Sequence, residues 1–151
     1  MLFRENLRFG ANAALLAGLA LASGCTGETE SAGDPNTFPA AALTTMDSDA
    51  GDLFIEVRTA PQQPPARGVS NVDLHIVSTV GKVPLDALVV SATPWMPDMG
   101  HGASVEPTVS NKYIGHYLVS DVEMFMPGRW ELRISTTGVV EDSAKVTFQI
   151  P

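Results

Sequence analysis

Two short segments of the chain concentrate side chains that bind soft metal ions. Residues 94–102 read Pro-Trp-Met-Pro-Asp-Met-Gly-His-Gly, and residues 124–128 read Met-Phe-Met-Pro-Gly. Thioether sulfur prefers Cu(I), while imidazole binds copper in both oxidation states and zinc. The proline and the glycines favour a turn that could wrap its side chains around one ion. We therefore predict a copper site, with Cu(I) favoured, whose candidate ligands are Met96, Met99, His101, Met124, Met126 and His116.

Each donor also has a structural interpretation. Methionine commonly fills irregular gaps in protein cores, and this interpretation competes with ligation for Met124 and Met126 in particular. His101 lies between two glycines, where its ring could simply bond the backbone. Under the structural interpretation, His116 is a surface or capping residue. His75 is a more distant candidate, expected on the solvent face of a strand.

Other kinds of chemistry have weaker support. The chain contains no Gly-x-Ser-x-Gly elbow, no His-Glu-x-x-His motif and no phosphate-binding glycine loop, so we expect no enzyme. The single cysteine excludes an internal disulfide and a thiolate cluster. The formal net charge of −8 would repel a phosphate backbone, so we expect no nucleic-acid partner.

The N-terminus has the pattern of an export signal. Arg4 and Arg8 precede an apolar run over residues 13–22, which is shorter than the ~20 residues needed to span a bilayer. The run ends in Leu-Ala-Ser-Gly-Cys, which resembles a bacterial lipobox. We therefore predict a lipoprotein signal peptide over residues 1–24, with lipidation of Cys25 anchoring an exported protein in the cell envelope, on the periplasmic or outer-membrane face. The alternative is an ordinary secretory signal followed by an incidental cysteine.

The remainder divides by composition. Residues 25–52 comprise the lipidated cysteine and a segment rich in small, acidic and proline residues, predicted to be a flexible, disordered linker. From Leu53 to Pro151 apolar residues alternate in short segments separated by turn signals, which predicts an all-β, antiparallel β-sandwich of about seven strands. The large core residues are expected to be Trp130, Phe148 and Tyr117. The predicted strands are 53–57, 72–77, 88–93, 105–109, 117–124, 130–134 and 146–150.

Three motifs in order support a family resemblance. The Met-Pro-x-Met-Gly-His-Gly segment is followed by a Gly-x-Tyr motif at residues 115–117 and by Met-Pro-Gly-x-Trp from Met126. Together they resemble the YtkA-like domain family, which is related to FixH-like proteins linked to assembly of copper-dependent cytochrome oxidase. The resemblance covers about Leu53 to Pro151 and implies an immunoglobulin-like sandwich outside the cytoplasmic membrane. The matching positions are Met96, Met99, His101, Gly102, Gly115, Tyr117, Met126, Gly128 and Trp130.

Two functions follow as expectations. The first is a chaperone-like envelope lipoprotein that holds copper or passes it to an oxidase assembly or metal efflux system. A looser similarity to periplasmic copper chaperones points the same way, although their closing His-x-Met pair is lacking. The alternative is a scaffolding or interaction module without metal, whose acidic sandwich docks onto another envelope protein.

Overall fold

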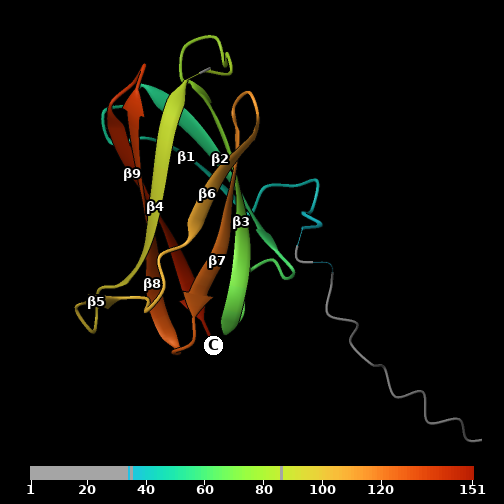
Figure 1. Cartoon of the computed structure of the whole chain (residues 1–151), viewed down its shortest axis with the longest axis vertical. Coiled ribbons are helices and arrows are strands. Elements are labelled where there is room, and N and C mark those ends of the chain that lie inside the picture. The colour runs from blue at the N-terminus through green and yellow to red at the C-terminus, as the bar shows by residue number, and fades with distance from the viewer. Residues whose placement is uncertain (1–33, 35, 86) are drawn as a thin grey trace, which may run out of the picture. The chain divides into compact units, whose positions relative to one another are not determined.

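The computed structural model describes residues 34, 36–85 and 87–151, which form nine β-strands in two antiparallel sheets (Figure 1). The prediction of an all-β antiparallel sandwich is confirmed. The predicted signal peptide and the lipidation site Cys25 lie outside the described residues. Within those residues no helix is both long and apolar enough to cross a membrane. The strands are β1 (Thr44–Asp47), β2 (Leu53–Ala60), β3 (Gly68–Ser78), β4 (Leu88–Met96), β5 (His101–Gly102), β6 (Thr108–Tyr113), β7 (His116–Met124), β8 (Gly128–Gly138) and β9 (Asp142–Ile150).

The two sheets have the orders β1-β2-β3-β7-β6 and β5-β4-β8-β9. The core residues of β2, β3, β8 and β9 fall at every second position, which turns one face of each sheet inward. The predicted core residues Trp130, Phe148 and Tyr117 are all buried, with exposed fractions of 2–3%. Burial of each such side chain contributes about 1.5–3 kcal/mol to the free energy of folding. This burial stabilises the fold in place of an internal disulfide, which a single cysteine cannot form.

The predicted linker is too long. Residues 44–47, assigned to it by composition, form β1 and pair with β2 from Thr44↔Val57 to Asp47↔Phe54. Met46 and the preceding Leu43 pack against the core. These two apolar side chains among polar neighbours are too few to give a periodic pattern. They suffice for an edge strand, because β2 supplies the strand with which β1 pairs.

Two further strand predictions need correction. The strand predicted at 105–109 lies three residues later, as β6, and its polar sequence is mostly exposed at the sheet edge. The strand predicted to end at Thr93 continues to Met96, because Pro94 and Trp95 remain paired with β8.

A bulge in β7 changes which side chains face the core. The register passes from Ser70↔Val122 to Val72↔Val119, so β7 has one extra residue at this point. Asp121 adopts the left-handed conformation there, with φ 63°, and its amide donates to Asn71 Oδ1 at 3.2 Å. The bulge thereby separates two neighbouring apolar side chains of β7, because Val122 packs in the core and Leu118 does not.

Candidate functional site

One end of the sandwich gathers both donor-rich segments. Here β4 ends at Met96, β5 follows at its edge, β7 ends and β8 begins, and Figure 1 shows this end at the bottom, with β5 at the left. The turn between β4 and β5 is held by two amides, of Met99 and Gly100, which donate to the carbonyl oxygen of Met96 at 3.2 and 2.9 Å. Gly100 has φ 70°, a conformation that glycine adopts without strain. We call this end of the sandwich the rim.

A hollow of about 280 Å³ at the rim contains one residue from each predicted ligand segment, His101 and Met126. Glu123, Phe125 and Trp130 complete much of its wall. The indole Nε1 of Trp130 donates to the carbonyl oxygen of Met126 at 2.9 Å, which fixes the backbone that carries the thioether. The two donor-rich segments therefore meet at one end of the sandwich through this pair.

The ring of His101 is oriented by the backbone of the next residue. Its Nδ1 lies 2.8 Å from the carbonyl oxygen of Gly102. Because a carbonyl oxygen only accepts, Nδ1 carries the hydrogen, and the neutral ring keeps the lone pair on Nε2. The bond expected under the structural interpretation is therefore present, and it leaves the other nitrogen available for a ligand.

The other predicted donors on these segments divide between core and surface. Met96 and Met124 belong to the hydrophobic core, with exposed fractions of 5% and 1%. The β4 alternation turns Met96 inward with Ala92, and the β7 bulge turns Met124 inward with Val122. Met99, on the turn, is 60% exposed. The structure therefore brings His101 and Met126 together at the rim and packs Met96 and Met124 beneath it.

His116 does not join the rim. It begins β7, whereas Met124 ends it, so the two are separated by roughly 26 Å of extended chain. Its ring instead stacks on that of His75, with centroids 4.2 Å apart and planes inclined by 14°. The sequence does not predict this pairing, because the two histidines lie on strands that are far apart along the chain.

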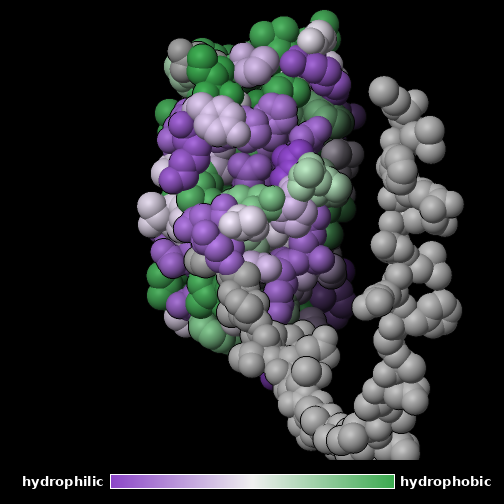
Figure 2. Space-filling view, turned by 90° about the vertical axis from the view of Figure 1, so that its right-hand side faces the viewer, coloured by the Kyte–Doolittle hydropathy of each residue, from purple (hydrophilic) through white to green (hydrophobic). Residues whose placement is uncertain are grey.

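Charged side chains of β2 and β3 surround the two histidines. Arg58 Nη2 lies 2.8 Å from Glu56 Oε2, and His75 Nδ1 lies 3.2 Å from the same oxygen. Hydrogen bonds from Arg58 and then from His75 hold the pKa of Glu56 below its usual value. Figure 2 looks onto the side that carries β3 at the right of Figure 1, and hydrophilic residues occupy much of its middle.

Asp98 is exposed and forms an ion pair with Arg129 at 2.8 Å across the rim. Among the described residues no group of three or more His, Cys, Asp or Glu is placed to hold a metal ion.

The comparisons with known proteins give one match. A family model described as YtkA-like matches residues 49–135 of the 151-residue chain, a span that includes both donor-rich segments. No curated protein and no solved structure matches.

Proposed function

The chain belongs to the YtkA-like family, and on that premise we propose that it is an exported, lipid-anchored envelope protein that binds Cu(I) at the rim. The ligands are Nε2 of His101 and the sulfur atoms of Met126 and Met99. The observation that carries the proposal is the hollow that His101 and Met126 share. Met99 lies in the turn that follows Met96, and its side chain is exposed enough to turn toward the hollow.

The donor set suits this ion. One neutral imidazole and two thioethers form an uncharged, soft ligand set, which favours Cu(I) over harder divalent ions. Phe125 and Trp130 add apolar walls. Glu123 lines the same hollow, but its carboxylate is a hard donor and is not assigned to the ion.

Met96 and Met124 are withdrawn from the ligand set. Their sulfur atoms could reach an ion only if these side chains left the core, and emptying such a position costs about 2–5 kcal/mol. Their role is to support the rim from beneath. His116 is also withdrawn from this site, because it lies at the opposite end of β7.

The biological task follows from anchor and site together. A diacylated Cys25 would hold the domain at a membrane surface in the envelope, and a solvent-accessible Cu(I) site can exchange its ion with a docked partner. An oxidase assembly factor or a metal efflux system is the partner class that uses such an exchange.

Thermal melting of the full chain tests binding. A ligand that binds only the native state raises the melting midpoint. Cu(I), supplied under reducing conditions without oxygen, should raise the midpoint of the wild type and leave that of His101→Ala nearly unchanged. If Cu(I) shifts both midpoints equally, the rim is not the site.

A metal-free docking module is the second candidate, and exposed apolar side chains favour it. Met99, Val105 and Phe125 are 60%, 47% and 56% exposed along the segments that form the rim. Such side chains suit a protein interface. This function predicts that His101→Ala lowers the melting midpoint by itself, while Cu(I) shifts neither protein.

A further inference from the structure

His75 and His116 occupy directly opposed positions on neighbouring strands, β3 and β7. The amide of Ile76 donates to the carbonyl oxygen of Gly115 at 2.7 Å, which makes His75 and His116 a non-hydrogen-bonded pair of the antiparallel ladder. Opposed side chains come closest at such pairs, about 4.5–5.5 Å apart at Cβ. Two imidazoles are therefore held within the span of a single bound ion.

Each imidazole has a carboxylate at its Nδ1. His75 Nδ1 lies 3.2 Å from Glu56 Oε2, and His116 Nδ1 lies 3.5 Å from Asp73 Oδ1. A carboxylate acceptor keeps the hydrogen on Nδ1 and leaves the lone pair on Nε2. Histidines that bind metal ions in proteins have this second partner almost without exception, because it fixes the ring and raises its basicity.

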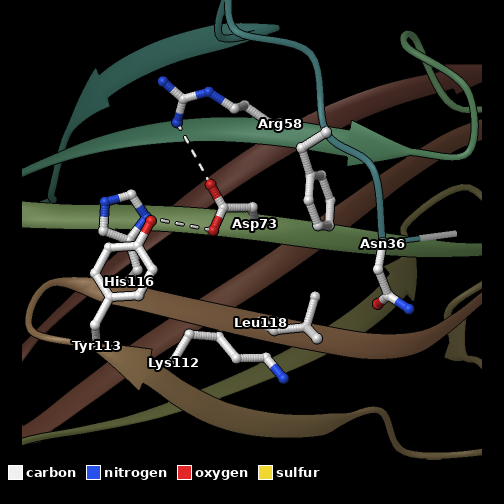
Figure 3. A pocket seen from close by; sticks show the side chains of 8 residues that line it. Asn36, Arg58, Asp73, Lys112, Tyr113, His116 and Leu118 are labelled. Carbon is white, nitrogen blue, oxygen red and sulfur yellow. Dashed lines mark hydrogen bonds and ion pairs between the residues drawn. The ribbon is translucent and has the colours of Figure 1, made fainter. Parts of the chain in front are cut away.

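The carboxylates are themselves held in place. Arg58 contacts Glu56 at 2.8 Å and Asp73 at 3.5 Å, so one guanidinium links both carboxylates. Figure 3 shows Asp73 between Arg58 and His116. The Tyr113 ring covers the other face of His116, with centroids 4.2 Å apart, so His116 lies between two rings.

The cluster is open to solvent on one side. The side chains of His75 and His116 are 26% and 19% exposed. A hollow of about 590 Å³, lined in part by Asp73, Lys112, Tyr113 and His116, adjoins the cluster and leaves room for water or a further ligand (Figure 3).

We propose that His75 and His116 form a second metal site, on the outer face of the five-stranded sheet, which binds a borderline divalent ion through two Nε2 atoms and water. Cu(II) is the preferred ion, because nitrogen donors bind it most tightly among the first-row divalent metals. On binding, the rings part from their stack while each Nδ1 keeps its carboxylate partner, so that both Nε2 atoms reach the ion. Glu56, Asp73 and Arg58 are positioning residues, and the site does not depend on the rim.

Titration of the full chain with Cu(II) tests the proposal, in a Cys25→Ser background that removes the thiol. The variants are His75→Gln, His116→Gln and Asp73→Asn. Lys145→Gln, an exposed position on β9 of the other sheet, is the control outside both sites, and His101→Gln reports any Cu(II) bound at the rim. Electron paramagnetic resonance of the bound Cu(II) counts the coordinating nitrogens, and circular dichroism confirms folding. If His116→Gln does not fold, His75→Gln decides the case, since Tyr113 contacts only His116 of the two rings.

We expect the parent chain to bind Cu(II) with a two-imidazole spectrum. The variants His75→Gln and His116→Gln should each lose about tenfold or more in affinity and show one imidazole fewer. Asp73→Asn should weaken binding by about tenfold, and Lys145→Gln should match the parent. Equal affinities of parent and His75→Gln, or a spectrum that changes only in His101→Gln, would overturn the proposal. Binding at the rim is measured with Cu(I), and binding at the histidine pair is measured with Cu(II). Either proposal can therefore be rejected while the other stands.

Discussion

The indole nitrogen of Trp130 donates a hydrogen bond to the carbonyl oxygen of Met126 at 2.9 Å, and thereby ties the rim loop to the core. Trp130 is 3% exposed and belongs to the hydrophobic core, whereas Met126 lines the rim hollow that also contains His101. Burial of one side chain therefore fixes the backbone that carries a proposed copper ligand.

Substituting Trp130→Phe should weaken both folding and copper binding. The variant loses one hydrogen bond and part of a buried ring, which should cost about 1–3 kcal/mol in the free energy of unfolding. The Met126 backbone would also lose its anchor, so Cu(I) affinity should fall in molecules that remain folded. Urea unfolding followed by Cu(I) titration measures both effects. Full retention of Cu(I) affinity would contradict the positioning role.

Met124 and Met99 should differ in what their removal costs. Met124→Ala empties a core position that is 1% exposed and should lower the free energy of unfolding by about 2–5 kcal/mol. Met99→Ala, at a position 60% exposed, should change it by less than about 0.5 kcal/mol. Urea unfolding of the metal-free proteins gives both values. A similar loss in the two variants would show that Met99 packs in solution.

Gly128 is required where β8 begins. Its φ is 126°, and a Cβ atom placed on it would come within 2.8 Å of the Met96 Cε. Gly128→Ala should therefore destabilise the protein by more than about 1 kcal/mol, through backbone strain and displacement of Met96. Gly51→Ala is a useful control, because its φ of 84° is also positive while no atom lies within 4 Å of its added Cβ. If both variants lose the same stability, the contact with Met96 contributes nothing.

Asp142 should make stability depend on pH in the acid range. Burial raises the pKa of this carboxyl group, but hydrogen bonds from Ser48 and from the amides of Ala50 and Ser143 outweigh burial and hold its pKa below the usual 3.8. Because folding lowers this pKa, ionised Asp142 stabilises the native state above pH 3.8, and its contribution disappears as the pH falls through the folded pKa.

Asp142→Asn removes this ionisation. Denaturant unfolding of both proteins between about pH 7 and about pH 2.5 should show a stability difference that is largest near neutrality and narrows in acid. A difference that stays constant over this range would show that ionisation of Asp142 does not stabilise the fold. Since Ser48 and Ala50 lie between β1 and β2 while Asp142 begins β9, the variant also tests a contact between the two sheets.

Alternation along the strands made much of the fold predictable. The core residues of β2, β3, β8 and β9 fall at every second position, and the predicted core residues are buried. Edge strands were harder to predict, because β1 and β6 bury little apolar surface and depend on pairing with an existing strand. Local composition does not contain that information.

The site was predictable only in part. The same alternation that predicts β4 would have placed Met96 inward with Ala92, had the strand been extended past Pro94. Met124 could not be placed in this way, because the bulge at Asp121 reverses the alternation within β7. The pairing of His75 with His116 depends on the register of strands separated by about 40 residues, which one sequence without an alignment does not specify.

Competition for Cu(I) against a chromophoric chelator tests the central claim most directly. The full chain, in the Cys25→Ser background, should bind one Cu(I) more tightly than about 1 μM, and His101→Ala and Met126→Leu should each weaken binding about tenfold or more. Met124→Leu, a conservative change in the core, should leave the affinity unchanged. If the parent binds no more tightly than about 1 μM, or if His101→Ala and Met126→Leu bind as tightly as the parent, the rim is not a copper site.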